Sequence, residues 1–114
     1  MNQNDENEGL DRVFMALADK TRRAMVHRLT RGEMTVSLLV DGFDMSYAAA
    51  SKHIKVLESA NLVLRRIEGR VHYISLAPER LGIALDWISI YRNFWQSRLD
   101  NLASSLENNE GEPR

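Results

Sequence analysis

The chain contains no cysteine, only two prolines and few aromatic residues among its 114 amino acids. The absence of cysteine excludes disulfide bonds, thiolate metal clusters and cysteine nucleophiles. No apolar run approaches the roughly 18 to 20 residues that a membrane-spanning helix needs, so we expect no membrane partner. The first nine residues are polar and acidic, unlike a signal peptide. Together with the length, these absences predict one soluble, cytoplasmic domain.

The sequence also lacks the polar groupings on which catalysis depends. It has no Gly-rich phosphate loop and no paired acidic motif, and Ser51 and His53 are too close on a predicted helix to face each other. We therefore predict a binding protein and not an enzyme, with no catalytic residue and no cofactor. The histidines, His27, His53 and His72, fall in three different predicted elements. Because a zinc site needs three or four converging ligands, we predict no metal site.

Charge is distributed unevenly along the chain. Residues 1–9 and 107–114 are acidic and have no apolar periodicity, so we predict that both are disordered tails around a domain of residues 10–106. That domain carries a net charge of +4, although the whole chain carries −1. Salt confines electric fields to about 8 Å, so local charge decides what a surface attracts. The overall balance is therefore compatible with a polyanionic partner.

Periodicity within residues 10–106 predicts five helices and one hairpin. Apolar spacing favours helices over residues 10–18, 20–31, 36–40, 47–60 and 78–106, with Asp19, Thr35 and Ser46 as N-caps. Two β-prone runs, residues 62–68 and 71–76, flank Gly69 and indicate a hairpin. The order α-α-α-α-β-β-α predicts a mainly α fold with a small β-hairpin. This is a winged helix-turn-helix with a carboxy-terminal helix added.

The predicted helix over residues 47–60 separates into two faces. Ala50, Ile54 and Leu57 form an inward stripe. The outward face is small, hydroxylated or cationic and carries no acid; it comprises Tyr47, Ala48, Ser51, Lys52 and Lys55. Such a face suits a helix that enters the DNA major groove. The hairpin adds Arg65, Arg66 and Arg70, which we predict to contact phosphates of double-stranded DNA.

The last predicted helix is apolar on two faces. Residues of one stripe follow alternating spacings of four and three, with Arg92 in one slot: Leu81, Leu85, Ile88, Trp95, Leu99, Leu102 and Leu106. A second stripe contains Ala84, Trp87, Tyr91 and Phe94. A single domain of this size can cover only one of these two apolar faces. The other face needs a second chain to cover it, which predicts a two-fold homodimer. The aromatic residues leave two interpretations open: plain packing, or the lining of a pocket for a small-molecule inducer.

The sequence resembles the ArsR family of dimeric winged-helix repressors over about residues 10–106. The resemblance lies in the residues at 16–23, 45–57, 61–63 and 68–73, which read ALADKTRR, MSYAAASKHIKVL, NLV and EGRVHY. It implies that helix 47–60 is the recognition helix and that the hairpin is the wing. It also implies that the first and last helices form the dimer interface, through Leu10, Val13, Phe14, Leu85, Ile88, Trp95, Leu99 and Leu102. The implied function is repression at a palindromic operator, ended by an inducer.

The sequence departs from the metal-sensing members of that family, which use cysteines near the third helix or Asp and His on the last helix. Neither set of ligands is present here, which places the chain in the cysteine-free branch. Two alternatives stay open at this point: a metal-responsive repressor, and a winged-helix module that contacts other proteins. A protein-contacting module would show Leu, Phe or Met where the outward face has Ala48, Lys52 and Lys55.

Overall fold

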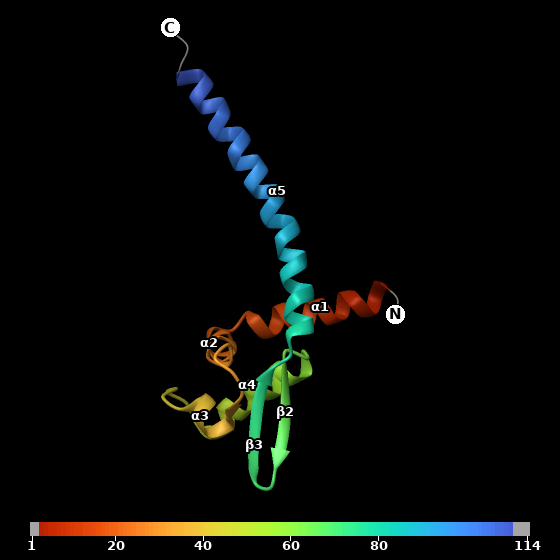
Figure 1. Ribbon diagram of the computed structural model, residues 1–114, viewed down its shortest axis with the longest axis vertical. Helices are drawn as coiled ribbons and strands as arrows, with labels where there is room; N and C mark the ends of the chain where they lie inside the picture. Colours follow the sequence, from red (N-terminus) through yellow and green to blue (C-terminus); the bar gives the residue numbers. More distant parts are fainter. Residues whose placement is uncertain (1–2, 111–114) are drawn as a thin grey trace. The chain divides into compact units, whose positions relative to one another are not determined.

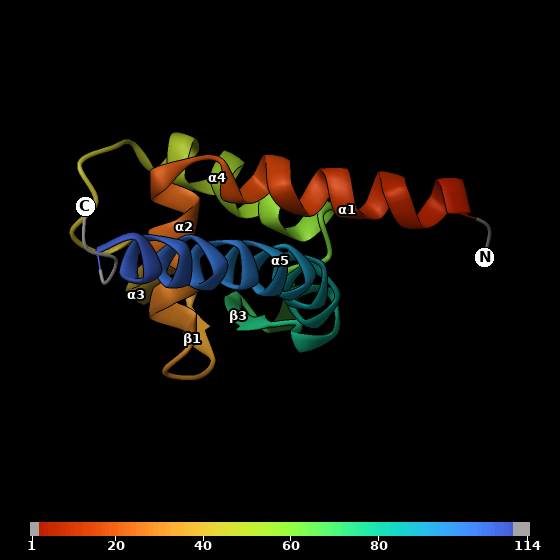
Figure 2. The same ribbon diagram turned by 90° about the horizontal axis from the view of Figure 1, so that it is seen from above.

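A computed structural model describes residues 3–110, with side chains described from residue 8 to residue 107. It contains five helices and three strands in the order α1, α2, β1, α3, α4, β2, β3, α5 (Figure 1; β1 is labelled in Figure 2). Their bounds are α1 Gln3–Leu17, α2 Lys20–Leu29, β1 Met34–Thr35, α3 Val36–Val40, α4 Tyr47–Ser59, β2 Val63–Glu68, β3 Val71–Leu76 and α5 Pro78–Glu110. The predicted winged helix-turn-helix architecture is confirmed.

The predicted helix starts follow from their caps. The side chains of Asp19, Thr35 and Ser46 each accept a hydrogen bond from a backbone N–H three residues later. Each cap therefore satisfies one of the amide groups that a helix start leaves without a partner. The N-cap predictions for α2, α3 and α4 are confirmed.

Both ends of the predicted domain extend further than the sequence indicated. Helix α1 begins at Gln3, seven residues before the predicted start, and α5 continues to Glu110. The structure describes residues 3–9 and 107–110 as helical, whereas their polar, acidic composition and lack of apolar periodicity favour disorder. The rest of the predicted tails, residues 1–2 and 111–114, lies outside the described residues.

The sheet has three antiparallel strands in the order β1-β3-β2. Strands β2 and β3 form the predicted hairpin, in register from Val63 opposite Leu76 to Glu68 opposite Val71. Gly69 turns the chain at a φ of 62°, in the left-handed region that glycine adopts without strain. Strand β1 was not predicted, since its two residues are too few to show an alternating pattern.

The core lies where the helices meet the sheet. Its fully enclosed side chains come from every layer: Val13, Met25, Leu39, Ile54, Leu57, Leu62 and Ile74. Helix α1 runs alongside α4, as Figure 2 shows, and Val13 and Ala16 of α1 are buried in the same cluster as Ile54. The inward stripe of α4 is thereby confirmed as core.

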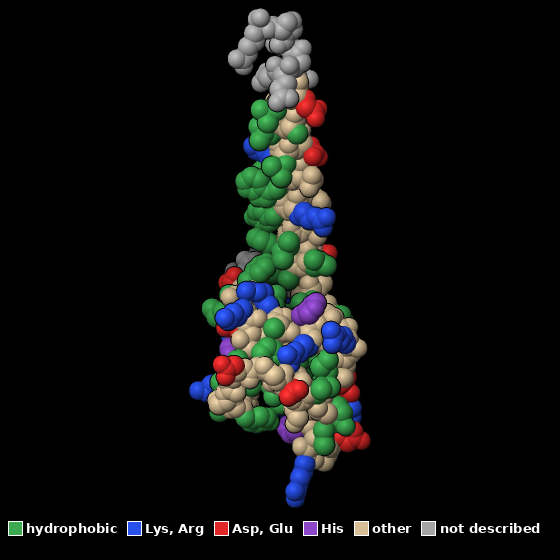
Figure 3. All heavy atoms as spheres, turned by 90° about the vertical axis from the view of Figure 1, so that its left-hand side faces the viewer, with side chains coloured by type: hydrophobic (Ala, Val, Ile, Leu, Met, Phe, Trp, Pro, Cys, Tyr) green, Lys and Arg blue, Asp and Glu red, His purple; other side chains and the backbone are tan. Residues whose placement is uncertain are grey.

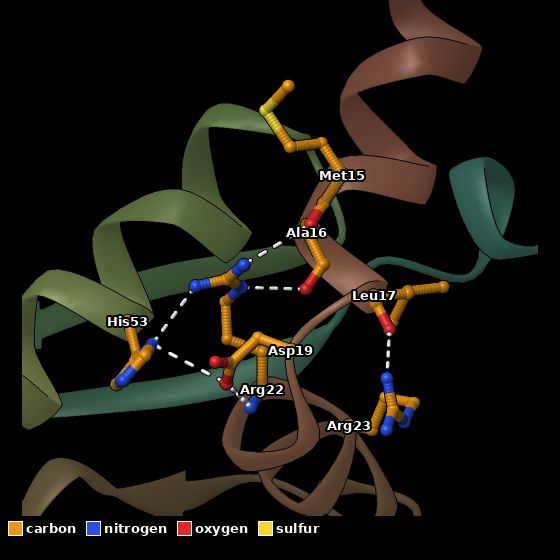
Figure 4. Close-up of polar contacts among 7 residues, drawn as sticks. All are labelled: Met15, Ala16, Leu17, Asp19, Arg22, Arg23 and His53. Atoms are coloured by element: carbon orange, nitrogen blue, oxygen red, sulfur yellow. Dashed lines mark hydrogen bonds and ion pairs between the residues drawn. The ribbon is translucent and has the colours of Figure 1, made fainter.

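The carboxyl end of α1 is closed by side chains of α2. Arg22 donates from Nε to the carbonyl of Ala16 at 2.6 Å and from Nη2 to that of Met15 at 3.2 Å. Arg23 donates from Nη1 to the carbonyl of Leu17 at 2.8 Å (Figure 4). Three of the carbonyls that a helix end leaves open are therefore satisfied.

The chain divides into two compact units, residues 1–84 and residues 85–114. The first unit holds the helices α1 to α4, the sheet and the start of α5, where Ala84 is 3% exposed. The second unit consists of the rest of α5 as far as it is described. No helix in the described part of the chain is long and apolar enough to cross a membrane.

Candidate nucleic-acid interface

Helix α4 presents one face to the core and the opposite face to solvent. Ala50, Ile54 and Leu57 are at most 1% exposed. The predicted outward residues lie on the other side: Tyr47, Ala48, Lys52 and Lys55 are exposed and Ser51 is half-buried. The structure thus brings this predicted set together on one surface, which we call the reading face.

The reading face is cationic and carries no carboxylate. Lys52 and Lys55 form no ion pair with any residue that the structure describes. The one acid of α4, Glu58, lies near its carboxyl end and pairs instead with Arg65 of β2. Two lysines without partners can therefore meet phosphates or base edges without first breaking an internal contact.

A polar cluster fixes α4 against α2. Arg22 Nη1 lies 3.1 Å from His53 Nδ1, and Asp19 Oδ2 lies 3.8 Å from the same nitrogen (Figure 4). Since arginine only donates, His53 Nδ1 accepts this hydrogen bond. The backbone N–H of Arg22 and the nearby guanidinium hold the pKa of Asp19 below its usual value. His53 therefore anchors the helix, and its place on the margin of the inward stripe agrees with that role.

The wing arginines lie in three different settings. Arg65 is half-buried and held by Glu58 and His72, whereas Arg66 is exposed and pairs with Glu33 and Glu68. These contacts raise the pKa of Arg65, chiefly through Glu58, and hold the pKa of Glu33 below its usual value through Arg66. Arg70, beside the turn, forms no ion pair among the described residues.

Sequence reasoning missed most partners of the wing arginines. Glu58, Glu33 and His72 come from α4, the segment before β1, and β3, so no local spacing connects them with the arginines. Only Glu68, two residues from Arg66 on β2, is a local partner. One available signal was strand alternation: neighbouring residues on β2 point to opposite faces, so Arg65 and Arg66 cannot contact the same DNA surface.

The predicted dimer residues separate into exposed and buried groups. Five residues of α5 are large, apolar and between 44% and 63% exposed: Leu85, Ile88, Trp95, Leu99 and Leu102. Figure 3 shows hydrophobic side chains following one another along α5. In α1, Leu10 and Phe14 are half-buried. Val13 is 1% exposed and belongs to the core of its own unit, so its assignment to the dimer surface is wrong.

The second unit also groups its aromatic rings. The ring centroids of Trp87 and Tyr91 are 4.4 Å apart, and those of Phe94 and Trp95 are 5.8 Å apart. Arg98 lies over the ring of Phe94 at 4.8 Å. All four rings are between 41% and 59% exposed, which leaves a large apolar area to be covered. Among the described residues, no group of three or more His, Asp or Glu could hold a metal ion.

The capped α4, its cationic face and the adjacent hairpin define a DNA-binding protein of the winged helix-turn-helix class. A family model described as a helix-turn-helix domain matches residues 17–66. The HTH-type transcriptional regulator Rv2034 of Mycobacterium tuberculosis is 38% identical over 97 residues, which cover 85% of this chain and 88% of the relative. An ArsR family transcriptional regulator of known crystal structure is 37% identical in sequence to this chain and superimposes with a TM-score of 0.73. The match covers 80% of this chain and 94% of that one. The chain belongs to the ArsR family of transcriptional regulators.

A third comparison concerns the fold alone. The solution structure of a homodimeric winged helix-turn-helix DNA-binding domain from Mycobacterium bovis has a TM-score of 0.63. It is 24% identical and covers 82% of this chain and 91% of that one. This domain shares the architecture described above.

Proposed function

We propose that the protein represses transcription by binding a palindromic operator as a homodimer, with α4 in the major groove. The observation that carries this proposal is the reading face. It has two lysines that form no ion pair within the described residues, no carboxylate, and small neighbours that allow close approach. A helix of this kind offers hydrogen-bond donors to phosphates and to the acceptors on guanine. We also propose that the protein acts in the cytoplasm.

Direct contacts are assigned to Tyr47, Ala48, Ser51, Lys52 and Lys55 on α4 and to Arg70 at the turn of the wing. Arg65 and Arg66, which the sequence placed in the same group, are occupied by carboxylates in the structure. Ser46 caps the helix with its hydroxyl on the N–H of Ala49 at 3.1 Å. The remaining open amides at the start of α4 favour a nearby phosphate.

The homodimer is proposed from the exposed apolar residues of α5. Leu85, Ile88, Trp95, Leu99 and Leu102 follow a seven-residue repeat, which is the spacing that lets two helices pack side by side. We also propose that Leu10 and Phe14 of α1 contact the partner chain. The solved domain from Mycobacterium bovis that shares this fold is itself homodimeric. A two-fold dimer places two α4 helices on successive major grooves, about 34 Å apart.

Repression follows from occupancy, because a dimer bound across two grooves excludes other proteins from the same DNA. The aromatic rings of α5 offer a surface for an apolar inducer, and binding there would act on the dimer and thereby on the operator. This part of the proposal depends on the grouping of Trp87, Tyr91, Phe94 and Trp95.

The test measures binding to a fluorescent duplex taken from the DNA upstream of the protein's own gene, against a random duplex of equal length. We expect a solution mass of two chains, preference for the upstream duplex, and reduced transcription from it in vitro. The double variant Lys52→Glu, Lys55→Glu should lose binding while keeping its mass and melting temperature. Lys20→Glu, on α2, is the control for a charge reversal away from α4 and should bind normally; its counterparts are the single variants Lys52→Glu and Lys55→Glu, which should each weaken binding. A single-chain mass together with indifference to either duplex at low salt would refute the proposal.

A further inference from the structure

Arg65 lies at the junction of the recognition helix and both strands of the wing. Its Nη2 donates to Glu58 Oε1 at 2.6 Å and its Nε to Glu58 Oε2 at 3.2 Å. Its Nη1 lies 2.9 Å from Nδ1 of His72, which accepts because arginine only donates. One side chain of β2 therefore connects α4 with β3.

This arrangement leaves Arg65 poorly suited to contact a phosphate. The bidentate pair with Glu58 neutralises its charge, and the side chains of the two residues are 21% and 31% exposed. A phosphate would have to displace a carboxylate that already accepts hydrogen bonds from two nitrogens of the guanidinium. Arg65 also shares a hollow of about 540 Å³ with Ser51, Lys55, Glu58, Ser59 and His72, which places the contact directly beside the reading face.

The other two arginines of the wing differ from Arg65. Arg66 stands opposite Tyr73 in the register, lies 4.3 Å over its ring, and pairs with Glu33 and Glu68. Arg70 is exposed next to Gly69 and forms no ion pair within the described part of the chain. Of the three, Arg70 is thus the cation that is ready to meet a phosphate.

We propose that Arg65 is a positioning residue: through Glu58 and His72 it locks the wing to the recognition helix, and the wing contacts DNA through Arg70. This inference rests on the proposed function. It assigns to Glu58, a carboxylate that DNA would repel, a favourable role in DNA binding. The role is to fix the distance between Arg70 and the reading face before DNA arrives, so that binding does not have to order the hairpin.

The variant Glu58→Gln distinguishes a positioning role of Arg65 from a direct phosphate contact, because the two roles change the DNA affinity in opposite directions. If Arg65 contacts phosphate and Glu58 merely competes for it, the variant frees Arg65 and removes a negative charge, so DNA affinity rises. If Arg65 positions the wing, the bidentate pair is weakened and affinity falls. Two phosphate contacts, one from each wing of the dimer, raise the DNA affinity roughly 60-fold at 0.1 M salt. We expect Glu58→Gln to lose part of this gain, so that the affinity falls about tenfold. A gain in affinity would overturn the inference.

A double-mutant cycle provides the second readout. Arg70→Ala should lower the salt dependence of binding, the slope of log K against log salt, by about 1.8, because each of two wings loses one phosphate contact. Arg65→Met should weaken binding in the wild-type background but have no further effect in the Arg70→Ala background, because it acts through Arg70. Additive losses would show that Arg65 has a phosphate contact of its own and would overturn the inference.

Arg65→Lys tests geometry at constant charge. A lysine satisfies a phosphate as a point charge but cannot form the two parallel bonds to Glu58, so the variant should behave like Arg65→Met. Rescue by lysine would contradict the positioning role. Melting temperatures near that of the wild type confirm that every variant is folded. If the wild type itself shows no salt-dependent binding to duplex, the proposed function fails; if it binds and Glu58→Gln binds more tightly, only this inference fails.

Discussion

Replacement of single lysines by glutamine gives a quantitative test of the reading face, because the chain has three lysines and only two of them lie on it. Lys52 and Lys55 are exposed on α4, whereas Lys20 is exposed at the start of α2. Glutamine keeps most of the length and the polarity of the side chain while removing its charge. The three variants are therefore matched in chemistry and differ in position.

The magnitude follows from the number of contacts. Each phosphate contact contributes about 0.9 to the slope of log K against log salt, so one lysine lost from each protomer of a dimer lowers the slope by about 1.8. At 0.1 M salt this corresponds to a roughly 60-fold loss of affinity. The double variant Lys52→Gln, Lys55→Gln should lower the slope by about 3.6 if both lysines contact phosphates.

Fluorescence anisotropy of a labelled upstream duplex, titrated at several salt concentrations, measures both quantities. Lys20→Gln should leave the slope and the affinity unchanged. Equal slopes for all three variants would refute the assignment of the reading face, since nonspecific attraction by the net charge of the domain does not depend on which lysine is removed. An unchanged slope for Lys52→Gln with lower affinity for one sequence would assign that lysine to a base edge.

Three further predictions concern stability and assembly. Leu99→Asp should convert the dimer to single chains and weaken operator binding through lost bivalency. The control Ser97→Asp should leave the mass measured by light scattering unchanged. A dimer that persists in Leu99→Asp would exclude this interface. Ile54→Ala removes a fully buried side chain and should lower the free energy of unfolding by about 2 to 5 kcal/mol in a urea titration. A change near zero would contradict the close packing of the core around Ile54. Asp19→Ala removes the cap of α2 and should cost about 1 kcal/mol at neutral pH. Folding lowers the pKa of Asp19 from 3.8. The stability that the Asp19 carboxylate contributes is therefore present above pH 3.8 and is lost as the pH falls through the lowered pKa. Urea titrations of the variant and the wild type should converge in that acidic range.

The faces of α4 could be predicted from the sequence because helical periodicity is local. Ala50, Ile54 and Leu57 recur on one side of the helix, and Ser46 marks its start within the same segment. The contacts of Arg65 could not be predicted, since Glu58 and His72 reach it from other elements and no short-range pattern records how those elements pack. Polar partners of this kind are a property of the folded arrangement.

The limits of α1 illustrate a second reason for differences. A helix without an apolar stripe gives no periodic signal, so residues 3–9 were assigned to a tail although they continue the helix. Val13 shows the converse case: it fits an apolar stripe that could face a partner, but it is buried in the core cluster of its own chain. Periodicity identifies a side chain that must be covered, and only the packing of the elements shows what covers it.

Arg22 of α2 bonds to the carboxyl end of α1 and to α4, so unfolding at the end of α1 affects the contacts of α2 and α4 as well. The same guanidinium holds the carbonyls of Met15 and Ala16 and reaches His53 on α4. Fraying of α1 from that end therefore releases the support beneath the recognition helix. Amide hydrogens at the end of α1, at the start of α2 and in the middle of α4 should exchange with solvent as one cooperative group.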